Sequence, residues 1–189
     1  SLHDALPIFD VDDLLKQADL AMYQAKAEGR NAVRFFDPQM QAVVSARAVL
    51  ENGLREAISQ QQLSLYYQAQ VNGEGIITGV EVLVRWHDPR RGMVPPAEFI
   101  PVAEETGLIL PLGQWVLDNA CSQLANWSRQ ISMAHLTVAV NVSARQFRQP
   151  DFVAQVISTL DYTGARAQRL KLELTESLLA DNVDDLTSK

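Results

Sequence analysis

Three apolar segments, each ending beside an oxygen-bearing side chain, constrain the fold of this chain more than any other feature. They run from Gly79 to Trp86, from Leu136 to Ser143 and from Leu170 to Glu176. Helical patterns separate them, and strands that alternate with helices of this size usually pair in parallel. The middle segment is apolar almost throughout, which is typical of a strand buried on both faces. The sequence therefore predicts an α/β fold with parallel strands.

The polar side chains of these segments are of kinds that bind metal ions. Glu81, Asn141 and Glu173 offer a carboxylate, a carboxamide and a second carboxylate, hard oxygen ligands that suit Mg²⁺ or Mn²⁺ better than zinc. In a barrel of parallel strands, side chains at the strand ends meet on one face. Arg85 follows Glu81 by four residues and so shares its strand face, where a guanidinium suits a phosphodiester. The pattern predicts half of a metal-dependent active site.

Each of these residues also has a plain structural interpretation. Glu81, Asn141 and Glu173 would equally cap strand ends by hydrogen bonds to loop backbone, and Arg85 would equally pair with a neighbouring acid. Trp86, Trp115 and Trp127 could form a stacking platform for guanine bases, but Trp115 and Trp127 recur at helical spacing among leucines, which favours packing in the core. No metal-ligand spacing involves His87 or His135, and Glu104-Glu105 is typical of a solvated acidic face.

Composition excludes several classes of protein. The net charge of −7, without a basic cluster, argues against binding to long nucleic acid. A single cysteine, Cys121, rules out a disulfide framework and a thiolate metal site, and we expect a buried, inert thiol in a reducing cytoplasm. No apolar run approaches the roughly 20 residues that span a bilayer. We therefore expect a cytoplasmic location, and a membrane anchor upstream in a longer parent protein stays open.

Local patterns predict the order of the elements. Residues 1–9 are an unassigned leader. Helical spacing is expected over 11–28 and 38–62, the second being a connector that leads into another domain near Leu50, with a short strand over 32–36 between them. A strand over 63–71 and one over 76–86 flank a hairpin-type turn at 72–75. Further along we expect helices from Pro95, over 112–128 and over 151–161, and strands over 135–142 and 168–174.

The first part of the chain resembles the end of a GGDEF domain, one of a bacterial pair that makes and degrades cyclic di-GMP. The stretch 18–31, Ala-Asp-Leu-Ala-Met-Tyr-Gln-Ala-Lys-Ala-Glu-Gly-Arg-Asn, resembles its last helix and final turn. The resemblance implies that residues 10–37 are a remnant of that domain. The signature motif and the nucleotide-binding loop of the family are not in this sequence, so cyclase activity is not expected here. With those parts missing, Lys26 and Arg30 are expected to be surface charges.

The remainder resembles the EAL domain, the partner that degrades cyclic di-GMP. Five motifs follow in the family's order: Leu65–Gln68, Glu81–Trp86, Pro95–Gly107, Asn141–Ser143 and Glu173–Glu176. The signature reads Glu-Val-Leu instead of Glu-Ala-Leu, which keeps the ligand. The resemblance implies the N-terminal half of an EAL-type (β/α)₈ barrel over residues 63–189, truncated at its C-terminus. It assigns Glu81, Asn141 and Glu173 to the metal, Gln68 and Arg85 to the substrate, and Glu176 to a loop beside the metal.

These assignments imply a function for a longer parent protein. We expect it to be a cyclic di-GMP phosphodiesterase that needs Mg²⁺ or Mn²⁺, releases the linear dinucleotide pGpG and forms a homodimer. The sequence holds neither the Asp-Asp-Phe-Gly motif nor the later lysine, glutamate and glutamine, which in the family supply further metal ligands and the general base. The fragment alone is therefore expected to be inactive. A degenerate EAL receptor that binds cyclic di-GMP without turnover, and a scaffold for another partner, stay open as alternatives.

Overall fold

The computed structural model describes residues 10–27 and 33–174 of the chain. The chain divides into two compact units, Ser1–Val49 and Leu50–Lys189, and each is described by itself. The predicted domain boundaries stay predictions. Within the described residues, no helix is both long enough and apolar enough to cross a bilayer.

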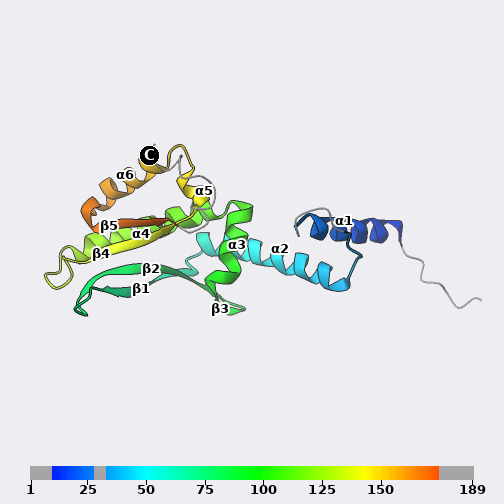
Figure 1. Cartoon of the computed structure of the whole chain (residues 1–189), viewed down its shortest axis with the longest axis horizontal. Coiled ribbons are helices and arrows are strands. Elements are labelled where there is room, and N and C mark those ends of the chain that lie inside the picture. Colours follow the sequence, from blue (N-terminus) through cyan, green and yellow to red (C-terminus); the bar gives the residue numbers. More distant parts are fainter. Residues whose placement is uncertain (1–9, 28–32, 175–189) are drawn as a thin grey trace, which may run out of the picture. The chain divides into compact units, whose positions relative to one another are not determined.

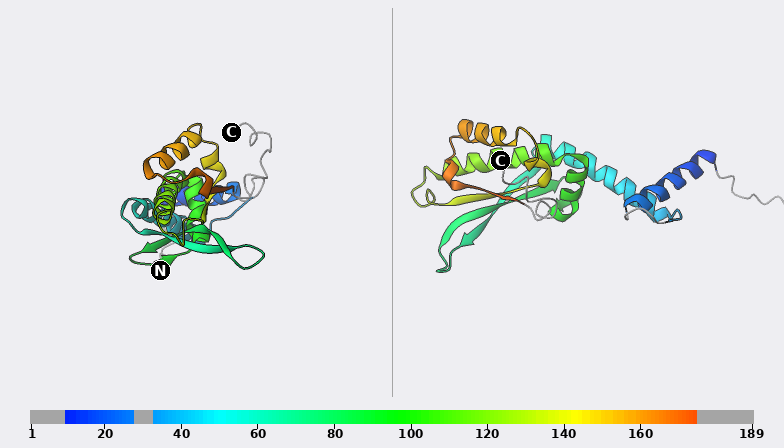
Figure 2. Two further views of the ribbon diagram at one scale, coloured as in Figure 1. Left: turned by 90° about the vertical axis from the view of Figure 1, so that its left-hand side faces the viewer. Right: turned by 45° about the horizontal axis from the view of Figure 1, so that its top comes forward.

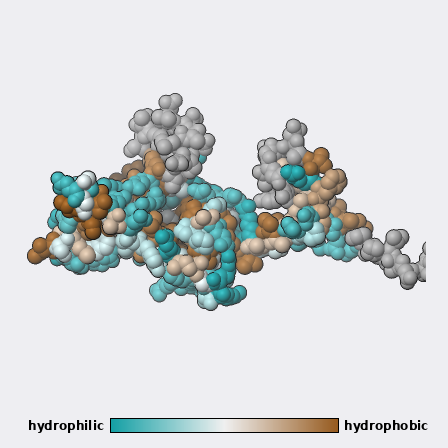
Figure 3. All heavy atoms as spheres, turned by 60° about the horizontal axis from the view of Figure 1, so that its bottom comes forward, coloured by the Kyte–Doolittle hydropathy of each residue, from teal (hydrophilic) through white to brown (hydrophobic). Residues whose placement is uncertain are grey.

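Two helices account for the smaller unit. Helix α1 spans Val11–Ala27, and α2 spans Pro38–Ser59, so that its first half belongs here. Several apolar side chains of this unit are exposed to solvent: Val11, Leu14, Leu15, Met22, Val33, Phe35 and Val43. Figure 3 shows brown, hydrophobic surface on this unit. Helix α1 matches the prediction for residues 11–28 as far as the structure describes them.

The strand predicted over 32–36 is wrong. Residues 33–36 have no regular structure, and Val33 and Phe35 are 82% and 86% exposed. A strand is stable only when its backbone groups pair with a neighbour, and no strand in the described part of this unit offers a pairing edge. The composition of this stretch favours a strand locally, but no neighbouring strand in the described part of this unit pairs with it.

The larger unit is built on a five-stranded mixed sheet (Figure 1). Its strands are β1 (Leu63–Val71), β2 (Ile77–Asp88), β3 (Gly92–Val94), β4 (Thr137–Val142) and β5 (Leu170–Leu174). The order is β1-β2-β4-β5, with β3 paired to the end of β2. The pairs β1–β2 and β2–β3 are antiparallel, whereas β2–β4 and β4–β5 are parallel. The predicted hairpin and the predicted parallel pairing are both confirmed.

Helices fill the connections between the parallel strands. They are α3 (Pro96–Thr106), α4 (Ile109–Trp127), α5 (Ala144–Phe147), α6 (Phe152–Thr163) and the 3₁₀ turn η1 (Ala167–Arg169). Pro96 opens α3 as expected, since the first turn needs no amide donor there. Figure 2 shows α4 and α6 on the same side of β4 and β5. The short elements β3 and α5 were not anticipated from the sequence.

The core lies between one face of the sheet and the helices that cover it. Valines of β2 and β4 meet the apolar stripe of α4 and the end of α2, with Leu54, Val82, Leu112, Val138 and Val140 at most 4% exposed. Trp115 and Trp127 are half-buried and pack against the core as predicted, with Trp127 edge-on to Tyr67. Trp86 is 1% exposed and lies edge-on to Phe99. Burying side chains of this size contributes about 1.5–3 kcal/mol each. The other face of the sheet is therefore the one on which polar groups can gather.

A small polar network joins α4 to α6. Gln114 Nε2 donates to Asp118 Oδ1, at 2.6 Å, and to Thr159 Oγ1; the Thr159 hydroxyl in turn donates to Asp118 Oδ1.

Burial and the Asp118 charge raise the pKa of the Cys121 thiol to about 11, so at neutral pH it is protonated. Because a thiolate is needed for nucleophilic or metal chemistry, this agrees with the expected inert thiol.

Candidate functional site

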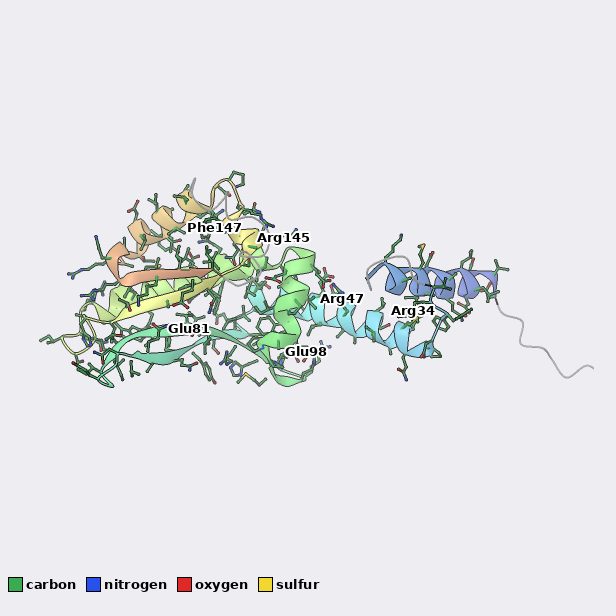
Figure 4. The ribbon with its side chains drawn as sticks, in the orientation of Figure 1. Arg34, Arg47, Glu81, Glu98, Arg145 and Phe147 are labelled. Atoms are coloured by element: carbon green, nitrogen blue, oxygen red, sulfur yellow. The ribbon has the colours of Figure 1, made fainter. Side chains whose placement is uncertain are left out.

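Strand register places the predicted site residues on one face of the sheet. In the β-ladders, Gln68 lies opposite Glu81, Glu81 lies opposite Ala139, and Asn141 lies opposite Glu173. Paired residues share a face, and side chains alternate along each strand, so all of these residues face away from the helix-covered core. Figure 4 labels Glu81 on β2.

A direct contact joins two of the predicted ligands. Asn141 Nδ2 donates a hydrogen bond of 2.7 Å to Glu81 Oε1, across 60 residues of sequence. The prediction that these side chains lie on the same face is therefore confirmed. Glu173, half-buried at the next position of the ladder, completes the row with Asn141. The roles of these residues as metal ligands stay a prediction.

The position of Glu81 within its strand differs from the expectation. We expected the segment to end near Trp86, with its polar groups at a strand end. Strand β2 runs on to Asp88, because β1 and β3 continue to pair with it after β4 has diverged. Its pairing with β4 covers only Gly79–Val82. Glu81 therefore lies at the end of the parallel part of β2, not at the end of the strand itself.

Arg85 and Asn141 line one cavity of about 190 Å³ at this end of the sheet. Its other walls come from Val82 and Val84 on the core side of β2 and from α3, α4 and α5, including Ile100, Leu112 and Gln146. Asn141 shares this cavity with Arg85, whereas Glu81 and Glu173 are not among the described residues that line it, so the prediction that Arg85 lines one opening with all three oxygen donors stays a prediction. The solvated acidic face expected for Glu104-Glu105 holds for Glu105, which is exposed, and is wrong for Glu104, which is half-buried and also lines this cavity. Its helical context gave no sign of this, because the cavity forms only when α3 meets β2.

Helix α5 fixes the segment that follows Asn141. The Ser143 hydroxyl accepts a hydrogen bond from the backbone N–H of Gln146, and the Gln146 side-chain oxygen accepts one from the backbone N–H of Ser143. This reciprocal capping ends β4 at Val142 and starts α5. Arg145 then donates to the backbone oxygens of Glu104 and Glu105, at the end of α3 (Figure 4). The turn after Asn141 is thereby tied to the wall of the cavity.

The remaining predicted residues have different outcomes. Gln68 is exposed on β1 and shares the face of Glu81. Glu176 lies outside the described residues, so its predicted role beside a loop is not described. Two residues that sequence reasoning passed over share this face as well: Tyr66 on β1 and Lys171 on β5. Ala139 on β4 pairs with Glu81 on one side and with Lys171 on the other. The positions of Tyr66 and Lys171, two residues from Gln68 and Glu173, were the available signal.

The donor set on this face is compatible with a divalent cation. The hydrogen bond between Asn141 and Glu81 uses the amide nitrogen and one carboxylate oxygen. The Asn141 amide oxygen and the second Glu81 oxygen keep lone pairs that a cation can accept. Within the described ranges no cluster contains three or more His, Cys, Asp or Glu side chains suited to a metal ion. A site here would thus combine two carboxylates with an amide, as Mg²⁺ and Mn²⁺ tolerate.

Fold and site together define a class of protein, an α/β domain that gathers oxygen donors and an arginine on the open face of a partly parallel sheet. Comparison with known families agrees. The protein-family model described as "EAL domain" matches residues 51–188 of this chain. The chain belongs to the EAL domain family.

Individual relatives agree with this family. The bifunctional diguanylate cyclase/cyclic di-GMP phosphodiesterase MucR of Pseudomonas aeruginosa is 40% identical over 173 residues, covering 91% of this chain and 25% of MucR. The cyclic di-GMP phosphodiesterase PdeR of Escherichia coli is 38% identical, covering 92% of this chain and 26% of PdeR. The chain spans about a fifth to a quarter of the length of the curated relatives it matches.

A solved structure supports the fold. The structure titled "PaMucR Phosphodiesterase, c-di-GMP complex" superimposes with a TM-score of 0.69 at 40% sequence identity. The match covers 72% of this chain and 56% of that one. The predicted α/β class with parallel strands is therefore confirmed. The fraction of a barrel that the chain represents, and the GGDEF identity of residues 10–37, stay predictions.

Proposed function

We propose that the parent protein hydrolyses cyclic di-GMP to linear pGpG, and that residues 63–189 form the first half of its EAL barrel. The observation that carries this proposal is the Glu81–Asn141 hydrogen bond, on the sheet face that also holds Glu173 and Arg85. Relatives at 38–40% identity that are named cyclic di-GMP phosphodiesterases support the substrate. The GGDEF remnant over residues 10–37 and a homodimer of the parent protein belong to the same proposal.

Mg²⁺ or Mn²⁺ fits the proposed reaction. Glu81, Asn141 and Glu173 would hold the ion through their oxygens. A bound divalent ion lowers the pKa of its water and neutralises charge on the phosphoryl oxygens. The chain's own contribution is geometric: the hydrogen bond from Asn141 fixes the Glu81 carboxylate before any ligand arrives, and the core behind the sheet holds both strands in place.

Substrate binding falls to residues on the same face. Arg85 would hold a phosphate through its N–H groups at the cavity that it lines with Asn141. Gln68, opposite Glu81 on β1, offers an amide donor and acceptor to the guanine or phosphate. Glu176 would steady the loop bordering the metal. Phosphate contacts made in both the ground and the transition state raise affinity more than the rate of the chemical step.

The test of the function is product formation by the parent protein. Purified protein with cyclic di-GMP and Mg²⁺ or Mn²⁺ should release pGpG, measured by liquid chromatography, and chelation of the metal should stop it. Tight binding of cyclic di-GMP without pGpG would contradict the phosphodiesterase and favour a receptor. Neither binding nor turnover would favour the scaffold alternative.

The 189-residue chain alone should not turn over cyclic di-GMP, even with excess Mn²⁺. It holds Glu81, Asn141 and Glu173 but not the Asp-Asp-Phe-Gly motif that supplies further ligands in the family. The measurement is pGpG release by the purified chain, next to the parent protein and a metal-free sample. Release above the metal-free sample would show that the described face suffices for catalysis.

In the parent protein, Arg85→Ala should raise KM for cyclic di-GMP about tenfold or more and change kcat less. The substitution removes a charge-assisted contact between the guanidinium and the phosphate, worth about 1.5–3 kcal/mol, which is made in both the ground state and the transition state. Arg129→Ala removes the same charge from an exposed position and should leave KM unchanged. An equal KM for both variants would contradict a phosphate-binding role for Arg85.

A further inference from the structure

The hairpin of β1 and β2 carries a row of polar and aromatic side chains beside the proposed site. Across its ladder Ser64 lies opposite Arg85, Tyr66 opposite Leu83, and Gln68 opposite Glu81. Because the side chains alternate along both strands, these residues and His87 project from one face, the face that also carries Asn141. Ser64, Tyr66 and His87 therefore lie on the same face of the hairpin as Arg85 without belonging to the predicted site residues.

Tyr66 makes a specific contact with Arg85. The guanidinium carbon lies 5.3 Å from the centroid of the Tyr66 ring, within the range of a cation–π contact. Arg85 Nη1 also donates a hydrogen bond of 2.9 Å to the backbone oxygen of Val84. The aromatic ring restrains the flat face of the guanidinium and the Val84 oxygen takes one N–H. The other in-plane N–H groups keep their capacity to bind an anion.

Two further side chains support Tyr66. The His87 ring lies 6.4 Å from the Tyr66 ring at an interplanar angle of 36°. A ring nitrogen of His87, Nε2, is 3.0 Å from the Ser64 hydroxyl, which is a hydrogen bond between the two strands. The chain of contacts therefore runs from Ser64 through His87 and Tyr66 to Arg85. Each link joins a residue of β1 to one of β2.

Tyr66 contributes little to the core. Its side chain is 47% exposed, whereas its neighbour Tyr67 projects to the opposite face and packs on Trp127. A large aromatic side chain is thus kept half in solvent on the face of the proposed site, where it contacts a cation. We propose that Tyr66 is a positioning residue that holds Arg85 in the orientation in which it binds a phosphate. This inference rests on the proposed function.

The first test compares two substitutions in the parent protein. Tyr66→Leu should raise KM for cyclic di-GMP about 2- to 5-fold, the loss expected for one exposed cation–π contact, with kcat nearly unchanged. Tyr66→Phe keeps the ring and should keep the KM of the unmodified protein. Val71→Ala, at an exposed position of the same strand, controls for effects on the hairpin. Equal KM values for Tyr66→Leu and the unmodified protein would overturn the inference.

The second test asks whether Tyr66 acts through Arg85. In an Arg85→Ala background, Tyr66→Leu should have no further effect on KM, because the group that it positions is gone. The same fold-change in both backgrounds would overturn the inference and indicate an independent contact of Tyr66 with substrate. Thermal unfolding of each variant separates these results from loss of folding.

The outcomes also separate this inference from the proposed function. If the unmodified parent protein releases pGpG and Tyr66→Leu is neutral, only the role of Tyr66 is wrong. If the unmodified protein releases no pGpG, the proposed function is wrong and the role of Tyr66 in phosphate binding falls with it.

Discussion

In the parent protein, Glu81→Gln should lower kcat for cyclic di-GMP hydrolysis by at least about 100-fold, with a smaller effect on nucleotide binding. The substitution keeps the shape of the side chain and one acceptor oxygen but removes the negative charge. It also replaces an oxygen that accepts from Asn141 Nδ2 at 2.7 Å, so one orientation of the new amide would set two N–H groups against each other. Loss of a metal ligand affects water activation and transition-state charge, which are felt mainly in kcat.

The measurement is steady-state kinetics combined with calorimetric titration of cyclic di-GMP. Glu74→Gln makes the same chemical change in the exposed hairpin turn and should leave both values unchanged. A kcat for Glu81→Gln within a few-fold of the unmodified protein would contradict the ligand role. If Glu81→Gln and Arg85→Ala both had small and similar effects, the scaffold alternative would gain over the enzyme.

Gly79→Ala should lower the free energy of unfolding of the larger unit by about 2–3 kcal/mol, the upper part of the usual range for forced overpacking. An added Cβ would lie 2.3 Å from Thr137 Oγ1 and 2.8 Å from the Thr137 backbone oxygen. Gly79 and Thr137 are directly paired at the start of the β2–β4 ladder. Strands β2 and β4 must move apart there, two residues before Glu81, so the hydrogen bond between Glu81 and Asn141 should weaken as well.

Urea unfolding followed by tryptophan fluorescence measures this effect, since all three tryptophans lie in the larger unit. Gly73→Ala is the matched control, because a Cβ at that turn glycine meets no atom within 4 Å. Thr137→Ala in the Gly79→Ala background should restore part of the stability by removing Oγ1, while the backbone oxygen still clashes. Unchanged stability of Gly79→Ala would show that the ladder can widen there at little cost.

The two substitutions test different properties of the same face. Glu81→Gln changes a functional group and leaves the sheet intact, whereas Gly79→Ala leaves the functional groups and disturbs the sheet that aligns them. Glu81→Gln should therefore keep its unfolding midpoint in urea while losing kcat. A marked loss of stability in Glu81→Gln would indicate that the Glu81–Asn141 bond is mainly structural.

Periodicity along the chain was sufficient to predict most elements of the larger unit. Strand β1 has the predicted bounds, and the hairpin turn at 72–75 and the helix opened by Pro96 lie where turn and capping chemistry indicated. These features are local, because they depend on residues a few positions apart. The prediction for 32–36 failed for the complementary reason, since a strand requires a neighbour that local composition does not reveal.

The sequence by itself determined which chemical groups the site contains: Glu81, Asn141, Glu173 and Arg85 stand in family motifs at the ends of apolar segments. Only the tertiary structure decided how they meet. The β2–β4 register brings Asn141 within 2.7 Å of Glu81, α3 places Glu104 at the cavity, and the hairpin sets the Arg85 guanidinium over the Tyr66 ring. The physical reason is that strand pairing and helix packing join residues distant in sequence, and those distances follow from the register and not from any local pattern.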